Sequence, residues 1–223
     1  MPLLENLVRL FAPHICLGCG AEEDRLLCES CVTELVPVPS RCYRCKAVTE
    51  DYKTCRECSA RSPLDQVAVF THHQALAKEL VHRMKYERAQ AGAREMAELM
   101  SALLPSFGAE VLVCHIPTAT SRVRKRGYDQ ALLLSRFLAR GRSVPRAALL
   151  LRTGQAHQVG SRRTERLRQL EGAFRPTHMH RAQGKHVVLV DDVLTTGATL
   201  ERAAQTLRRA GAKRVSAIVF SQA

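Results

Sequence analysis

Two adjacent carboxylates, Asp191 and Asp192, stand between an apolar run and a turn rich in threonine and glycine. The run, residues 187–190, is short, continuous and mostly β-branched, which predicts a buried parallel strand. The two acids therefore fall at the carboxyl end of a strand, the edge where ligands bind in open α/β sheets. The turn that follows contains Thr195, Thr196, Gly197 and Thr199.

This turn has the chemistry of a phosphate site. Its backbone N–H groups and hydroxyls can surround a phosphate, and Gly197 permits a close approach that a Cβ would block. A helix predicted to begin near Ala198 directs its N-terminal dipole to the same point. Because two carboxylates repel a phosphate, we expect them to hold the 2′ and 3′ hydroxyls of a ribose, with a divalent cation nearby. The segment suits a ribose 5-phosphate; the alternative is a strand that ends in an ordinary capping turn.

Two further segments are rich in arginine. Residues 111–130 read as an apolar strand ended by Pro117, then a basic loop before another helix, and this loop could bind a pyrophosphate leaving group. Its cations are Arg122, Arg124, Lys125 and Arg126. The second segment, residues 151–174, could close over a substrate, with Gly154 and Gly160 as hinges. Its cations include Arg162, Arg163, Arg166 and Arg168.

Residues 187–200 resemble the phosphoribosyl pyrophosphate (PRPP) motif of type I phosphoribosyltransferases. The resemblance implies that Asp191 and Asp192 are the catalytic acids, which orient the ribose through its hydroxyls, and that the threonine-rich turn holds the 5-phosphate. It also implies that Mg²⁺ binds together with PRPP. The reaction would transfer phosphoribosyl to a nucleophile as pyrophosphate departs; the acceptor is not identifiable.

The whole chain resembles the ComF family of bacterial competence-associated proteins. The resemblance is carried by this motif, the R-x-R-K-R-G-Y-D-Q segment at 122–130, the Q-x-x-S-R-R-x-E-R…GAF segment at 158–174 and an N-terminal cysteine cluster. Two residues depart from the family pattern: Asp129 and Gln169 stand where asparagine is expected. The resemblance implies a type I phosphoribosyltransferase-like parallel sheet preceded by a zinc-ribbon domain.

The same resemblance implies a role in natural transformation. Expected partners are PRPP or ribose 5-phosphate, single-stranded DNA, and competence helicase or recombination-mediator proteins; the alternative is a non-catalytic DNA- or partner-binding scaffold. Lys85 and Tyr86 look like the family's K-Y element, which could reach the site, although they could equally be a helix C-terminal lysine and a half-buried tyrosine. The candidate anion-binding residues are Arg122, Arg126, Arg163, Arg166 and Lys85.

Eight of the nine cysteines form four C-x-x-C pairs. Each pair suits half of a tetrahedral Zn²⁺ site, so two zinc ions are expected. The pairs are Cys16/Cys19, Cys28/Cys31, Cys42/Cys45 and Cys55/Cys58. Both a sequential and an interleaved grouping satisfy the spacing. Disulfides or a redox dithiol are the alternatives, but the chain shows no signal peptide. Four thiolates leave no open position on zinc, so we expect a structural role. The ninth, Cys114, reads as a small buried hydrophobic residue.

Length and charge predict two domains. The 223 residues allow one core of about 150 residues plus a small metal-stapled unit. We expect an amphipathic helix and a double zinc ribbon over 1–62, and the larger domain over 63–223. The net charge is +13, and the positive surplus lies beyond residue 62, which predicts DNA contact there. No apolar run is long enough for a membrane span, and we expect a cytoplasmic protein.

Alternating strand and helix patterns predict a parallel sheet with helices on both faces. Strands are expected at 66–71 and near Val111, Ala147, Val187 and Val215. Helices are expected at 131–139, at 198–210 and along an apolar stripe formed by Leu76, Leu80, Val81 and Met84.

Overall fold

The structure is a computed structural model that describes residues 14–86, 89–104, 110–153 and 172–223. The amphipathic helix expected near the N-terminus lies outside the described residues. The same holds for Arg163, Arg166 and Gln169, and for the rest of the second Arg-rich segment from residue 154 to 171. No helix in the described ranges is both long and apolar enough to cross a membrane.

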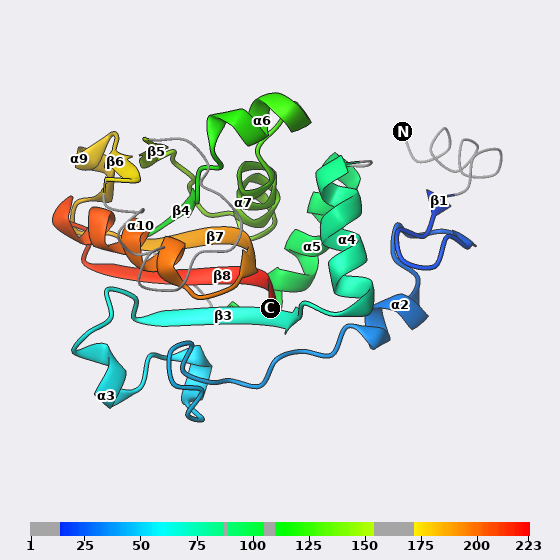
Figure 1. The fold of residues 1–223 in the computed structure, drawn as a ribbon, viewed down its shortest axis with the longest axis horizontal. Coiled ribbons are helices and arrows are strands. Elements are labelled where there is room, and N and C mark those ends of the chain that lie inside the picture. Colours follow the sequence, from blue (N-terminus) through cyan, green and yellow to red (C-terminus); the bar gives the residue numbers. More distant parts are fainter. Residues whose placement is uncertain (1–13, 87–88, 105–109, 154–171) are drawn as a thin grey trace.

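A four-stranded parallel sheet forms the centre of the fold (Figure 1). Its strands, in spatial order, are β3 (Gln66–His72), β8 (Arg214–Gln222), β7 (His186–Leu194) and β4 (Val111–His115). All four are rich in apolar residues, valine above all, because a sheet covered on both faces shows no polar side to water.

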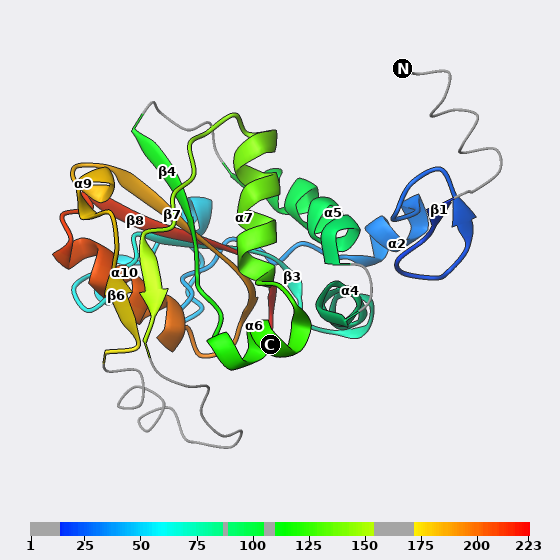
Figure 2. The same cartoon turned by 90° about the horizontal axis from the view of Figure 1, so that it is seen from above.

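Helices cover both faces of this sheet, which confirms the predicted fold class (Figure 2). One face packs against α4 (Ala75–Tyr86), α5 (Ala89–Ser101) and α7 (Gln130–Gly141), and the other packs against α10 (Ala198–Arg209). The stripe predicted along 76–84 is the buried face of α4. On the first face, the rings of Phe70 and Phe220 stack with centroids 5.7 Å apart.

Three elements differ from the predictions. The basic segment after β4 is a helix, α6 (Thr120–Arg126), and not a loop. The strand expected near Ala147 is reduced to one parallel bridge, in which Arg146 pairs with Val113 of β4. The strand that follows, β5 (Leu150–Arg152), pairs in antiparallel fashion with β6 (Phe174–Pro176), and α9 (Met179–Ala182) comes next. Strand β7 continues past both acids to Leu194, because β8 pairs with it over that length while β4 ends at His115.

The first cysteine-rich unit contains β1 (His14–Ile15), β2 (Glu22–Glu23) and α2 (Glu29–Glu34). It sits beside α4 and α5. Its buried Leu17 and Leu27 share one apolar cluster with Leu76 and Met84 of α4. This unit therefore extends the core on the α4 and α5 side.

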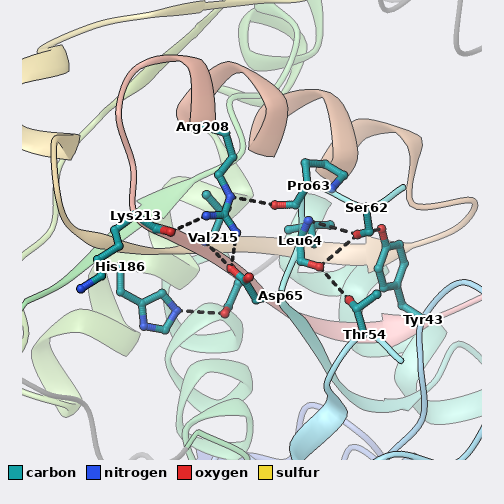
Figure 3. A network of polar contacts seen from close by, with 11 residues as sticks. Tyr43, Thr54, Ser62, Pro63, Leu64, Asp65, His186, Arg208, Lys213 and Val215 are labelled. Carbon is teal, nitrogen blue, oxygen red and sulfur yellow. Dashed lines mark hydrogen bonds and ion pairs between the residues drawn. The ribbon is translucent and has the colours of Figure 1, made fainter. Parts of the chain in front are cut away.

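The second cysteine-rich unit contains the 3-10 helix η1 (Glu50–Tyr52) and α3 (Arg56–Ser59), and it lies along the edge strand β3. Backbone bridges join Pro37 to Thr71 and Lys53 to Gln66. Figure 3 shows how the segment between this unit and β3 is held, with Arg208 of α10 donating to the Pro63 carbonyl and to Asp65. A domain boundary at residue 63 stays a prediction.

Candidate functional site

The acid pair lies where β7 extends beyond β4, at the carboxyl edge of the sheet. Asp191 Oδ1 accepts a hydrogen bond from the Asp192 N–H at 2.9 Å. Burial and the neighbouring Asp192 carboxylate raise the pKa of Asp191 well above its ordinary value, and Lys85 opposes that shift. A ligand that donates hydrogen bonds to Asp191 would stabilise its charged form and would therefore lower its pKa.

Lys85, in the last turn of α4, makes an ion pair with Asp192 (Nζ to Oδ2, 2.8 Å). Both side chains are largely buried, with 21% and 16% exposed. A water-poor ion pair of this kind fixes the orientation of the carboxylate more firmly than a solvated one would. Lys85 therefore lies at the acids, as the family resemblance implies.

The end of α4 also contacts the basic segment. Tyr86 receives a hydrogen bond from Arg126 (3.3 Å), whose guanidinium lies 5.2 Å from the Tyr86 ring centroid. The Tyr128 hydroxyl donates to the Met84 carbonyl. These contacts hold α6 against α4, so Arg126 and Lys85 come from different elements to one side of the acid pair.

The threonine-rich turn leads from β7 into α10 as predicted. Gly197 is the N-cap, with a φ of 77°, in the left-handed region that favours glycine. The helix therefore begins at Ala198, whose N–H donates to the Thr196 hydroxyl at 3.4 Å, and the first N–H groups of the helix face the turn. Thr195 is exposed, while Thr196 and Thr199 are half-buried. The turn offers hydroxyls and N–H groups together at the start of a 12-residue helix.

The second cysteine-rich unit packs directly against this turn. A Cβ built on Gly197 would lie 3.3 Å from the ring of Tyr43, which stands between Cys42 and Cys45. The Tyr43 hydroxyl donates to Glu201 Oε1 in the first turn of α10 (2.8 Å), and Arg44 pairs with the same oxygen at 3.3 Å. Tyr43 and Glu201 are each 8% exposed, so this is a buried connection between the second cysteine-rich unit and the threonine-rich turn.

Arg152 is a cation at the site that the sequence did not single out. Its guanidinium lies 5.4 Å from the Phe174 ring centroid. Burial and the nearby Arg122 lower its pKa, whereas Asp191 and Asp129 oppose the shift. Arg152 is thus close enough to Asp191 for their charges to interact, and Arg122 lies near Arg152. The available signal was its position at the end of a strand, directly before Thr153 and a glycine.

Asp129, one of the two departures from the family pattern, has a structural role. Its carboxylate accepts from the Leu132 N–H (3.2 Å), capping α7, and from the N–H and hydroxyl of Thr118 (2.7 and 3.2 Å). It is buried, and these donors occupy its oxygens. Asp129 thereby ties the turn after β4 to the start of α7.

The cysteines form two clusters that could each hold a zinc ion, and their grouping is sequential. The clusters are Cys16, Cys19, Cys28 and Cys31, and Cys42, Cys45, Cys55 and Cys58, with the sulfurs of each within 4.8 Å of one another. Sulfurs at tetrahedral corners about 2.3 Å from zinc would be about 3.8 Å apart. Three sulfur-to-sulfur distances agree with this value: 3.7 Å for Cys16 and Cys31, 3.8 Å for Cys19 and Cys28, and 3.6 Å for Cys45 and Cys55.

In each cluster the backbone favours the thiolate of one cysteine, whereas the pKa values of Cys28, Cys31, Cys45 and Cys58 are raised, with neighbouring thiols among the causes. Burial raises the pKa of Cys16, but N–H groups of Cys28, Cys19 and Gly18 outweigh it and lower that pKa to about 6. Cys42 behaves in the same way, and its pKa is also lowered to about 6. Cys114 differs: it is fully buried on β4, and burial raises its pKa to about 12. This confirms Cys114 as a small buried hydrophobic residue.

The structure thus brings Asp191, Asp192, Lys85, Arg122 and Arg126 to one edge of the sheet, and adds Arg152, Tyr43 and Glu201 to that neighbourhood. Two histidines contact serines of β8. His186 bonds Ser216 at the opposite end of β7 (2.9 Å), and His73 bonds Ser221 at the carboxyl edge (2.8 Å).

Comparisons with known proteins place this site in context. The family described as "Phosphoribosyl transferase domain" matches residues 131–222. The chain is 30% identical to the DNA utilization protein YhgH of Salmonella typhimurium over 207 residues, 85% of this chain and 87% of that protein. It is 29% identical to the competence protein ComFC of Bacillus subtilis over 84% of this chain and 80% of that protein. It is 26% identical to competence protein F of Haemophilus influenzae over 85% of this chain and 87% of that protein.

Proposed function

Because the chain belongs to the ComF family and contains a phosphoribosyltransferase-fold domain, we propose that it binds PRPP at the acid pair and the turn before α10. The observation that carries this proposal is the ion pair of Asp192 with Lys85 directly before the Gly197 turn. It orients an acid beside a phosphate-binding turn, the combination that a ribose 5-phosphate requires.

Each residue has a proposed role. Asp191 and Asp192 accept hydrogen bonds from the ribose 2′ and 3′ hydroxyls, which favours the ionised form of Asp191. The N–H groups and hydroxyls of Thr195, Thr196, Gly197 and Thr199 hold the 5-phosphate. The first turn of α10 adds its dipole. Glu201 lies in that turn too, but Tyr43 and Arg44 contact its carboxylate and offset its charge.

We propose that the pyrophosphate end lies toward α6 and β5. Arg122, Arg126 and Arg152 are the described cations on that side, and Lys85 contributes from α4. Arg163 and Arg166, outside the described residues, are assigned there by the family resemblance alone. Mg²⁺ bound with PRPP would offset the charge of the leaving group, and the acid pair is the oxygen donor set nearest to it.

The reaction that fits this arrangement is phosphoribosyl transfer. The bond from C1 of the ribose to pyrophosphate breaks, the pyrophosphate leaves with the electron pair, and a nucleophile forms the new bond to C1. Cations fixed beforehand at the leaving group stabilise the charge that develops on it. The ribose hydroxyls on Asp191 and Asp192 keep the sugar in place while it reacts.

Replacing Thr196 by alanine tests the phosphate turn. We expect Thr196→Ala to weaken ribose 5-phosphate binding by about 1–3 kcal/mol, the usual loss when a hydrogen bond to a charged group is removed. Calorimetric titration of ribose 5-phosphate measures the change. Thr206→Ala is the matched control, because its hydroxyl bonds the Arg202 carbonyl further along α10. Equal losses in the two variants would contradict the assignment.

We further propose that the protein handles single-stranded DNA in the cytoplasm, where thiolates for zinc stay reduced. The names of its relatives, which refer to competence and DNA utilization, support this role. So does the basic surface of α6, on which Arg122, Arg124 and Lys125 are exposed. Competence helicase or recombination-mediator proteins are the proposed protein partners.

Charge removal on α6 tests the DNA proposal. We expect Arg124→Gln/Lys125→Gln to weaken binding of a single-stranded oligonucleotide and to reduce the slope of log K against log salt by about 1.4, at about 0.7 per phosphate. Electrophoretic titration at several salt concentrations measures both. The control Lys213→Gln/Arg214→Gln removes the same charges at the start of β8, the opposite edge of the sheet. DNA binding that ignores salt, or that falls equally in both variants, would contradict the proposal.

A further inference from the structure

A cavity of about 430 Å³ lies between the second cysteine-rich unit and the carboxyl ends of β3 and β8. Its floor is apolar and includes Val67 and Val69 of the edge strand, with Val38 opposite them. Tyr43 and Tyr52 also line it. Apolar walls favour an apolar ligand group over a hydrated one, because the burial of apolar surface lowers the free energy of the complex. Aromatic side chains in the lining favour a planar ring in particular, because rings pack well against one another.

The side chains lining the cavity have one sign of charge. Among the described residues that line it, Arg41, Lys46, His72 and His73 are basic and none is acidic. Arg41 and Lys46 are exposed, so these two cations stand at the rim while the buried valines form the floor. A ligand that places a ring on the floor would therefore direct an anionic group toward the rim.

The cavity adjoins the phosphate-binding turn. Tyr43 lines the cavity and also touches Gly197 with its ring. Ala223, at the other side of the lining, donates its N–H to the Leu194 carbonyl directly before the turn (3.0 Å). His73 lies close enough to Asp192 and Lys85 for their charges to affect its pKa, which burial lowers. The two sites thus share walls formed by residues of β3, β8 and the cysteine-rich unit.

We propose that this cavity binds a planar aromatic carboxylate, with the ring on Val67 and Val69 and the carboxylate at Arg41 and Lys46. The assignment of this ligand as the phosphoribosyl acceptor rests on the proposed function; the binding site itself does not. In the transfer, a proton-bearing nitrogen of the ligand, such as an amino group on the ring, forms the bond to C1 of the ribose as the C1–pyrophosphate bond breaks. Pyrophosphate takes the electron pair, and the proton of that nitrogen passes to water.

Binding of 2-aminobenzoate, a small fluorescent aromatic carboxylate, tests the site in the full zinc-loaded chain. We expect saturable binding, at least tenfold weaker binding of the neutral analogue 2-aminobenzamide, and at least a tenfold loss in Arg41→Gln/Lys46→Gln. The control Arg56→Gln/Arg61→Gln changes two exposed basic residues of the same unit that do not line the cavity. The control matches the rim variant because Lys46 and Arg56 each follow a cysteine of the second cluster. The control variant should bind the probe as tightly as the wild type does.

Two further measurements separate the outcomes. Inorganic phosphate should displace the probe much less effectively than benzoate does. Equal displacement by the two would show that the cavity binds anions in general, and it would overturn the proposal. Equal affinity for acid and amide, or an unchanged rim variant, would also overturn it. Asp191→Asn/Asp192→Asn should bind the probe normally, because these residues do not line the cavity. If the wild type bound the probe but not PRPP, that result would contradict the proposed function without contradicting this binding site.

Discussion

Removing zinc is expected to weaken PRPP binding as well as to unfold the two cysteine-rich units. Metal binding and folding are one equilibrium in such small units, with an apparent binding free energy of about 10–16 kcal/mol per zinc. The buried apolar side chains of each unit, such as Leu17 and Leu27 in the first and Val38 in the second, join the core clusters of the larger domain and do not form a separate core. We therefore expect close to two zinc ions per purified chain, one for each cluster.

We expect the loss of zinc to weaken PRPP binding through Tyr43. Its ring touches Gly197, and its hydroxyl bonds the buried Glu201 carboxylate. Burial raises the pKa of Tyr43, so the hydroxyl keeps its proton and remains a donor. If the loop from Cys42 to Cys45 unfolds, Glu201 loses two of its partners, Tyr43 and Arg44, in the first turn of α10. An unpaired buried carboxylate beside the phosphate turn would then repel the ligand.

Cys19→Ser and Cys45→Ser separate the two clusters. Each removes an exposed ligand that is the second cysteine of its C-x-x-C pair, so the chemical change is matched. We expect each to lose about one zinc ion by metal analysis. We expect PRPP affinity to fall at least tenfold more in Cys45→Ser, since only the second cluster adjoins the turn. Unchanged PRPP affinity after loss of the second zinc would contradict this coupling, and four disulfides in the purified chain would contradict the zinc assignment.

The threonine-rich turn between β7 and α10 and the cysteine clusters could be predicted because their signals are local. In residues 187–200 the strand, the acids and the glycine follow one another directly, and no distant contact is needed to recognise them. The four C-x-x-C pairs are equally compact. Their sequential grouping could not be predicted, because both groupings satisfy the same spacing and only the path of the chain distinguishes them.

Contacts between distant segments had no such signal. Tyr43 and Glu201 are 158 positions apart, and each reads in the sequence as an ordinary tyrosine or helix glutamate. Arg152 is one arginine in a chain with many, and its proximity to Asp191 depends on how β5 leaves the main sheet. Helix α6 had a readable signal, since arginine and lysine are good helix formers and Gly127 ends the helix in a left-handed turn. Its charge density favoured the loop interpretation instead.

Replacing both acids is expected to abolish most PRPP binding. Asp191→Asn/Asp192→Asn keeps the shape of both side chains but removes the charged acceptors for the ribose hydroxyls. A hydrogen bond to a charged group contributes about 1.5–3 kcal/mol, so two such losses predict at least a 100-fold weaker complex. The variant also leaves Lys85 without the carboxylate it contacts at 2.8 Å, which frees this cation to move away from the ribose.

Isothermal titration of PRPP with Mg²⁺ into the wild type and into Asp191→Asn/Asp192→Asn tests the central assignment directly. The control Asp24→Asn/Asp51→Asn removes the same charge from two exposed acids. We predict saturable binding of about one PRPP per chain in the wild type and in the control, and at least a 100-fold loss in the site variant. Equal affinity in the wild type and the site variant would show that the acid pair is not a ribose site.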